Sequence, residues 1–580
     1  MAEKSKAETV LDALRASGEF GPNFVVVKRI RGSPASYEDF PDWIDAQLVA
    51  ALRKKGIDRL YSHQREAVEL IAAGRNVCLV TPTASGKTLA YNLPVMNELM
   101  SKPDVRSLYI FPTKALAQDQ LKEFLDIADS ASGRIKAHTY DGDTPADVRR
   151  SVRLSAHVVI TNPDMLHTGI LPHHTKWNRF FANLRYVVLD ELHIYRGVFG
   201  SHVANLMRRL KRVCRFYGAK PVFICCSATV ANPKEHAENL IEEEFELVDK
   251  SGAPTADRIF AFYNPPVVNR ALGMRANFLN EAKRLAIRFV ESDVSTIVFA
   301  TSRLNVEVLT RYLKERFDRD RLPHEQHMVS GYRGGYLPEL RRSIERGLKD
   351  GTIRCVVSTN ALELGIDIGR LEACIVAGYP GTIASMWQQA GRAGRRRETS
   401  VVIFVARSHP LDQYIVNRPD YFFGSSPERC LVNPDNLAIL LSHVQAASFE
   451  LPFDEGERFG NADVSDILDV LDEKGIVHKS GGRYHWTSDS YPADSVSLRS
   501  ATPDNFVVLD SSRKPPVAIG EVDYRSAFIY LHPGAIYMVE SDTYHIDELD
   551  IESRRALASP VSVDYYTDAM THALIRILDV

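Results

Sequence analysis

The sequence predicts an α/β protein with two tandem domains built on parallel sheets, followed by a winged helix and a small β-rich domain. Short apolar runs rich in β-branched residues alternate with helical patterns in two successive stretches of the chain. This alternation is typical of parallel sheets covered by helices on both faces. After Pro427 the pattern changes to short strands separated by polar or Gly-rich turns. At 580 residues the chain is also longer than one hydrophobic core usually supports.

Residues 1–56 are expected to form an N-terminal extension with a helical tip, the segment "NFVVVKRI" and a second helix. The first α/β domain should cover residues 57–255, with strands in "NVCLVTP", "SLYIFP", "HVVITNP", "YVVLDE" and "PVFICCSAT". A Pro- and Gly-containing linker is expected near residues 251–270. The second α/β domain then covers residues 256–426, with strands in "STIVFATSR", "IRCVVSTNA", "EACIVAGYP" and "SVVIFVARS".

Residues 427–500 are predicted to form the winged helix. The segment "ADVSDILDVLDEKGIVHKSGGRYHWTS" has the pattern of a helix, a turn and two strands joined by a Gly-Gly turn. Residues 501–580 alternate in the manner of antiparallel strands and form the β-rich region. The sequence stops in the apolar run "ALIRILDV" without a cap or polar tail, so we expect the natural protein to continue beyond Val580.

The composition is that of an ordinary soluble protein, with 45% hydrophobic and 25% charged residues. No apolar run approaches the roughly 20 residues that span a bilayer, and no signal peptide is recognisable, so a cytoplasmic location is expected. The net charge of −3 means that any site for nucleic acid must be a local patch. The seven cysteines lack C-x-x-C spacing, which predicts buried thiols and no zinc site.

The segment "TPTASGKT", from Thr81 to Thr88, has the spacing of a phosphate-binding loop. It follows the apolar strand "NVCLV" and precedes a helix, which is the context that this motif requires. Backbone amides of the loop and the helix N-terminus are expected to hold the phosphates of ATP, through Thr83, Ala84, Ser85 and Gly86. Lys87 should reach the β- and γ-phosphates, and the hydroxyl of Thr88 should bind Mg²⁺.

Two carboxylates, Asp190 and Glu191, end the apolar strand "YVVL". Buried acids are costly unless a cation or hydrogen-bond donors meet them. Because this strand belongs to the same predicted sheet as the phosphate loop, we expect Asp190 to hold the nucleotide-bound Mg²⁺ through water. Glu191 can then polarise the water that attacks the γ-phosphate. His193 is expected to couple the nucleotide to the second domain, although a merely packed histidine is the alternative.

Five motifs occur in order along about 370 residues: "YSHQ", "TPTASGKT", "DELH", "SAT" and "QQAGRAGRR". Together they resemble those of the superfamily 2 DExH-box helicases. The longer segments "DELHIYRGVFGSHVANLMRRL" and "HTYDGDTP" are similar to the bacterial mitomycin-repair helicases and their fungal RecQ-like relatives. The downstream pattern "GEVD…LHPGAIY…VDYYT" resembles the same group. The resemblance implies that the two α/β domains are RecA-like.

The resemblance also implies roles for individual residues. Gln64 would read the adenine edge, and Gly365 and Asp367 would face the nucleotide from the second domain. Arg392 and Arg395 would act as arginine fingers on the transferring phosphate. Donors brought by a second domain complete a site only when the cleft closes, which ties hydrolysis to motion. The alternative for "GRAGRRR" is a solvated basic loop.

Hydroxyl and basic side chains near strand ends are candidates for contacts with the phosphates of a nucleic-acid strand. The candidates are Thr113, Lys114, Thr161, Thr301, Arg303 and Thr359. As a group they indicate a strand-binding surface, because each follows or ends a strand at the same sheet edge. Taken singly, each could be an ordinary helix cap.

Two further regions leave alternatives open. The segment "MRRLKRVCR" places Arg208, Arg209, Lys211, Arg212 and Arg215 on one helix, which is either a nucleic-acid face or a solvated face. The wing contains Arg483, Tyr484, His485 and Trp486, whose aromatic rings either stack on a displaced base or belong to the core of the winged helix.

The resemblance implies an ATP-dependent DNA helicase or translocase of 3′→5′ polarity that acts in DNA repair on single-stranded or tailed duplex DNA. A monomer is expected, and repair proteins that bind it are not identified. The alternatives are an RNA-remodelling ATPase and a nucleotide-gated scaffold for repair partners, although a scaffold has no need of Glu191 or Arg395. Bacterial family members continue into a cysteine-rich zinc-binding domain, and no such cysteine cluster occurs in this sequence.

Overall fold

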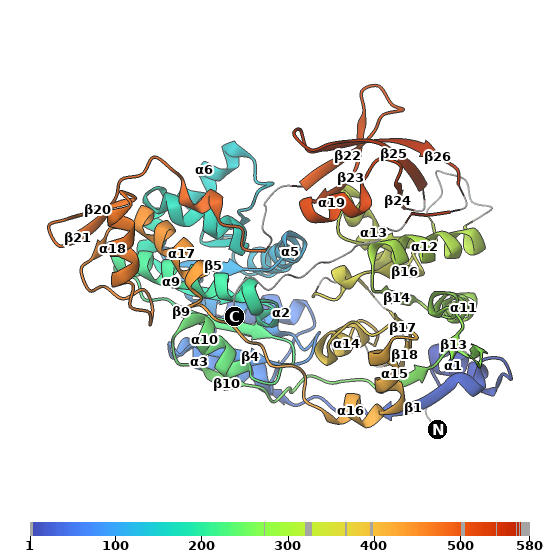
Figure 1. The fold of residues 1–580 in the computed structure, drawn as a ribbon. Coiled ribbons are helices and arrows are strands. Elements are labelled where there is room, and N and C mark those ends of the chain that lie inside the picture. The colour runs from blue at the N-terminus through green and yellow to red at the C-terminus, as the bar shows by residue number, and fades with distance from the viewer. Residues whose placement is uncertain are drawn as a thin grey trace.

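The computed structural model describes residues 4–271, 273–318, 327–365, 368–369, 371–394, 398–499, 505–540, 542–563, 565–567 and 569. Two seven-stranded sheets with helices on their faces form the body of the molecule (Figure 1). The predicted fold class, with two tandem RecA-like domains, a winged helix and a small β-rich domain, is confirmed. Among the described residues, no helix is both long enough and apolar enough to cross a bilayer.

The first sheet is parallel throughout, as its apolar strands predict. All residues of β4 and all but one of β8 are buried. Parallel strands end at the same sheet edge, so the loops after them can share one site there. The strand order is β10 (Glu246–Val248), β4 (Val77–Val80), β9 (Val222–Ser227), β8 (Leu184–Leu189), β5 (Arg106–Ile110), β7 (Val158–Thr161) and β6 (Ala137–Thr139).

The second sheet has six parallel strands and one antiparallel edge strand, β1. Its order is β1 (Phe24–Ile30), β11 (Arg258–Tyr263), β18 (Ser400–Val405), β17 (Ala373–Ala377), β14 (Thr296–Ala300), β16 (Cys355–Ser358) and β15 (Val329–Tyr332). The expected linker near residues 251–270 is therefore wrong in part. Residues 258–263 form β11, which is buried along most of its length.

The N-terminal segment is divided between the two domains. Helix α1 (Lys6–Ala16) and strand β1 pack on the second domain. Helix α2 (Ala46–Lys54) packs on the first. Between them the chain crosses beside the 251–257 segment, where the amide of Ser36 donates to the carbonyl of Gly252 at 2.9 Å. Two hydrogen-bonded segments therefore join the domains.

The winged helix consists of α17 (Leu437–Glu450), α18 (Ser465–Glu473) and the short strands β19 (Phe453–Asp454), β20 (Val477–Ser480) and β21 (Arg483–Trp486). It lies against the first domain, whereas the β-rich domain lies against the second (Figure 1). The β-rich sheet has the order β23 (Val517–Asp523), β22 (Asn505–Asp510), β26 (Arg555–Val561), β25 (Asp542–Asp550) and β24 (Ile536–Val539). The pair β22–β26 is parallel, unlike the antiparallel pattern expected for this region.

Candidate active site and strand-binding surface

The phosphate loop joins β4 to α4 (Lys87–Ser101) in a tight turn. Ala84 and Gly86 have left-handed backbones, with φ of 63° and 81°. A side chain at Gly86 would be strained by the positive φ, and its Cβ would lie 2.5 Å from Nε2 of Gln64, which would have to move. The ammonium of Lys87 donates to the carbonyl of Thr81 at 2.8 Å. Loop amides at a helix N-terminus are the arrangement that binds phosphate groups.

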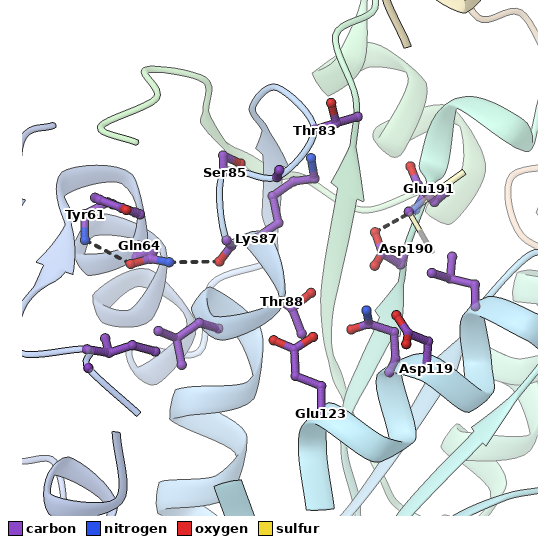
Figure 2. Close-up of a pocket in the computed structure, with 18 of the residues that line it drawn as sticks. Tyr61, Gln64, Thr83, Ser85, Lys87, Thr88, Asp119, Glu123, Asp190 and Glu191 are labelled. Carbon is purple, nitrogen blue, oxygen red and sulfur yellow. Dashed lines mark hydrogen bonds between the residues drawn. The ribbon is translucent and has the colours of Figure 1, made fainter. Parts of the chain in front are cut away.

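Gln64 connects this loop to the start of α3 (Ser62–Ala72). Its Oε1 accepts from the amide of Tyr61, and its Nε2 donates to the carbonyl of Gly86, both at 2.9 Å (Figure 2). The side chain is buried, yet Gln64 lines the same cavity as the phosphate loop. The predicted contact with an adenine edge stays a prediction. The two hydrogen bonds show that Gln64 also connects the start of α3 to the phosphate loop.

His63, beside Gln64, connects the phosphate loop to the interdomain segment. Burial lowers the pKa of His63 to about 4, so the ring is neutral near pH 7. Its Nδ1 accepts from the amide of Gly252 at 3.1 Å. The proton of the neutral ring is therefore on Nε2, which donates to the carbonyl of Ser85 at 3.1 Å. Sequence reasoning missed this residue, because its partner Gly252 lies almost 190 residues away.

Asp190 and Glu191 follow β8 and are buried at the same sheet edge. Glu191 has a left-handed backbone with φ of 54°, and its amide donates to Oδ1 of Asp190 at 2.8 Å. The hydroxyl of Tyr91 donates to Oδ2 of Asp190 at 3.3 Å. Burial and the adjacent charge of Glu191 raise the pKa of Asp190 to about 7. These two hydrogen bonds only partly offset the cost of burying the carboxylate, which favours a cation beside it.

The second domain completes the site at three points. A Cβ added to Gly365 would lie 3.1 Å from Oε1 of Glu191, so the backbone approaches the carboxylate closely. Nε2 of His193 lies 2.7 Å from Nε2 of Gln388 on α14 (Ile383–Ala390), and Nδ1 of His193 lies 3.5 Å from Oε2 of Glu191. His193 therefore lies between Glu191 and the second domain, and its predicted role in coupling the nucleotide to that domain stays a prediction. Arg392 is buried and donates to the carbonyl of Glu363 at 2.7 Å.

One cavity of about 580 Å³ brings together most of the predicted nucleotide residues. It is lined by Gln64, Thr83, Ala84, Ser85, Gly86, Lys87, Thr88, Asp190, Glu191, Gly365 and Arg392. Asp367 and Arg395 lie outside the described residues. Sequence reasoning missed an acidic wall of the cavity, formed by Asp119 and Glu123 of α5 (Lys114–Ala131), which Figure 2 shows opposite the phosphate loop. These acids carry no motif that could have identified them.

The strand-binding candidates separate into two groups. Thr301, Arg303 and Thr359 of the second domain line a common pocket of about 460 Å³. In the first domain, Thr113 caps α5 and Lys114 pairs with Asp143 at 2.8 Å. Thr161, also in the first domain, is buried, and its hydroxyl donates to the carbonyl of Tyr140 at 2.7 Å. The Thr161 hydroxyl therefore faces the protein interior, away from a strand.

Both alternatives for the basic helix are wrong for three of its arginines. On α9 (Gly197–Phe216), Arg208, Arg209 and Arg212 are buried against the winged helix and its flanks. Arg209 pairs with Glu450 of α17. Arg208 pairs with Glu242 at 2.6 Å and Asp435 at 2.8 Å, and Arg212 pairs with Glu457 at 2.7 Å. Arg215 is exposed, whereas the ammonium of Lys211 contacts the carbonyl of Ile241.

In the wing, the ring of Tyr484 belongs to the core of the winged helix, which was the alternative to stacking on a displaced base. Tyr484 is buried and its hydroxyl donates to Asp469 of α18. Trp486 packs edge-to-face on Phe449 with ring centroids 5.9 Å apart. Arg483 pairs with Asp454 at 2.6 Å, while His485 is exposed.

Comparison with known proteins places this geometry in a family. Sequence profiles match residues 61–236 (DEAD/DEAH box helicase), 280–397 (helicase conserved C-terminal domain) and 432–501 (ATP-dependent helicase HRQ1, winged helix domain). YprA of Bacillus subtilis, called an uncharacterized ATP-dependent helicase, is 50% identical over the whole chain, which spans 76% of YprA. The ATP-dependent helicase HRQ1 of Saccharomyces cerevisiae is 37% identical over 88% of the chain, which spans about half (48%) of HRQ1.

Among solved structures, the DUF1998 helicase MrfA bound to DNA and AMPPNP is 50% identical, with a TM-score of 0.93. The match covers 99% of this chain and 79% of that structure. A score this high over nearly the whole chain means that the domains are also arranged alike. The chain belongs to the superfamily 2 helicases of the MrfA and HRQ1 family, a family of ATP-dependent helicases.

Proposed function

We propose that this chain is a DNA motor that moves 3′→5′ along a single strand, driven by ATP hydrolysis, and that it acts in DNA repair. One observation carries the proposal. The phosphate loop and Glu191 of the first domain share a cavity with Gly365 and Arg392 of the second. A hydrolytic site divided between two domains makes turnover depend on their closure, which is how a motor couples ATP to movement.

The residues present fit nucleotide-bound Mg²⁺. Thr88 offers a hydroxyl and Asp190 a buried carboxylate, and oxygen ligands of this kind suit Mg²⁺. When bound, the ion would neutralise phosphate charge and offset the burial of Asp190. Lys87 supplies a positive charge at the phosphate loop, and Glu191 is placed to accept a proton from the attacking water. Arg392 would stabilise charge on the transferring phosphoryl group.

The choice of DNA rests on the MrfA structures, which are described as bound to DNA. The 3′→5′ polarity and the role in repair rest on family resemblance. An RNA-remodelling ATPase is the competing possibility, because hydroxyl and guanidinium groups that hold phosphates do not distinguish the two sugars. The experiment therefore has to compare the two nucleic acids directly.

The test measures ATP turnover with single-stranded DNA, duplex DNA or RNA, and unwinding of duplexes with a 3′ or a 5′ tail. We expect stimulation by single-stranded DNA and unwinding from the 3′ tail only. The Lys87→Ala variant, which removes the charge at the phosphate loop, should bind DNA without hydrolysing ATP. Stimulation by RNA alone, or unwinding only from a 5′ tail, would contradict the proposal.

A further inference from the structure

One short segment of the second domain connects the strand-binding pocket to the nucleotide cavity. Its first residues, Thr359 to Ala361, line the pocket of about 460 Å³. Further along the segment, Gly365 lines the nucleotide cavity. The hydroxyl of Thr359 accepts from the amide of Ala361 at 3.4 Å and caps the short turn η5 (Asn360–Leu362). Glu363 follows this turn directly and so lies between the groups at the two cavities.

The side chain of Glu363 is bound to helix α14, beside the strand-binding pocket. The hydroxyl of Ser385 donates to Oε1 of Glu363 at 2.7 Å, and Nε2 of Gln389 donates to Oε2 at 2.9 Å. Both donors belong to residues that line the pocket. The carboxylate of Glu363 is buried, so its oxygens need hydrogen-bond donors in place of water. These two bonds anchor the turn to α14.

The backbone of Glu363 contacts the nucleotide cavity instead. Its carbonyl accepts from Nη2 of Arg392 at 2.7 Å, and Arg392 lines that cavity. Arg392 follows the C-terminus of α14, the same helix that holds the side chain of Glu363. A guanidinium group is a rigid planar fork of donors, so the position of one acceptor constrains where the other donors point. The place of the Glu363 carbonyl therefore influences the direction of the remaining Arg392 donors.

We propose that Glu363 is a positioning residue, which places Arg392 for hydrolysis when a strand occupies the second-domain pocket. The inference rests on the proposed function and deepens it, because it names the residue through which the strand acts on ATP. A strand phosphate held at Thr359 orders the start of the segment. The anchored side chain of Glu363 transmits that order to the carbonyl that contacts Arg392. Without the anchor, the turn can respond to a strand without moving Arg392 into place.

The test measures ATP turnover with and without single-stranded DNA, together with the KM for ATP and the affinity for the strand. Glu363→Ala removes two buried hydrogen bonds, so the stimulated kcat should fall by about 10- to 30-fold. The KM for ATP and the strand affinity should change by less than about 2-fold, because Glu363 is not among the described residues that line either cavity.

Two further variants separate positioning from other roles. Glu363→Gln should keep most of the stimulation, because its Oε1 can accept from Ser385 and its Nε2 can donate to Oε1 of Gln389 once the Gln389 amide rotates. That Oε1 has no hydrogen-bond partner in the described part of the chain. The control is Glu281→Ala on α11 (Phe278–Glu291), which removes a buried, hydrogen-bonded carboxylate outside both cavities. It should lower the melting temperature without changing the stimulated kcat.

Three results would overturn the inference. Glu363→Ala could keep the full stimulation by single-stranded DNA. Glu363→Gln could lose as much stimulation as Glu363→Ala, which would mean that the charge of Glu363 acts directly instead of its hydrogen bonds. Glu363→Ala could also raise the KM and weaken strand binding along with kcat, which would mean that it only disturbs the fold of the second domain. By contrast, wild-type protein that hydrolyses ATP without responding to any nucleic acid would refute the proposed function itself.

Discussion

The nucleotide cavity and the interface between α9 and the winged helix both bury charged side chains, but they treat them differently. At the interface, Arg208, Arg209 and Arg212 each pair with a carboxylate. At the cavity, Asp190 and Glu191 have no lysine or arginine nitrogen within 4.0 Å among the described residues. A buried charge with a built-in partner of opposite charge holds domains together, whereas buried carboxylates without a lysine or arginine partner mark a place for a cation.

The strongest test of the cavity side of this comparison is Glu191→Gln. The amide keeps the shape of the side chain but cannot accept a proton from water, so ATP turnover should fall by about 10²–10⁴-fold. The melting temperature should not fall, because the change removes one of two adjacent buried charges. Turnover near the wild-type value, measured with single-stranded DNA present, would remove Glu191 from the catalytic step.

The interface side is tested by Arg209→Ala, which leaves Glu450 buried without its partner. The free energy of unfolding should fall by about 3–5 kcal/mol. Arg215→Ala, on the exposed part of the same helix, should change it by no more than about 0.5 kcal/mol. If Arg209→Ala instead left stability intact and weakened DNA binding, the helix would be a nucleic-acid face after all. Replacing Arg209 and Glu450 together by methionine should recover most of the stability.

A smaller effect is expected from His63→Ala. This change removes the hydrogen bond from the ring to the phosphate loop and the one from the 251–257 segment to the ring. Two lost bonds contribute about 2 kcal/mol, so DNA-stimulated turnover should fall by roughly 30-fold or less. His63→Gln keeps one donor and one acceptor and should recover part of the loss. His478→Ala, at an exposed histidine of the winged helix, is the matched control. An unchanged ratio of stimulated to basal turnover would show that this link does not couple the domains.

The smallest expected effects separate two threonines that the sequence treats alike. Thr161→Val leaves the carbonyl of Tyr140 without its donor, so it should lower stability by about 1–2 kcal/mol and leave DNA affinity unchanged. Thr359→Val, in the second-domain pocket, should weaken DNA binding with little change in melting temperature. Reversed outcomes would place the strand on the first domain's β7 instead.

The nucleotide site could be predicted closely from sequence because each part of it is local. The loop "TPTASGKT" and the acids of "DELH" follow apolar strands directly, so the chain order alone places them at one sheet edge. Gly365 and Arg392 came from family resemblance, and the cavity does bring them to the same place.

The failures share a physical cause, which is contact between segments far apart in the chain. The sequence pattern indicates a linker where β11 forms, because the partner strand β1 lies about 230 residues upstream. The pattern of arginines on α9 predicts an exposed face, because the elements that cover them follow more than 200 residues later. A helical pattern of arginines does not reveal whether another domain packs over it.

The role of Asp190 as a buried charge kept for the nucleotide-bound cation is tested most directly by the melting temperature of Asp190→Asn, measured with and without Mg²⁺ and a non-hydrolysable ATP analogue. Without ligand the variant should melt at or above the wild-type temperature, because burial and the charge of Glu191 disfavour ionised Asp190. With ligand, wild-type protein should gain stability and the variant should gain much less. A variant that melts below wild type without ligand, and gains as much stability with it, would contradict the claim that this charge is kept for the nucleotide-bound cation.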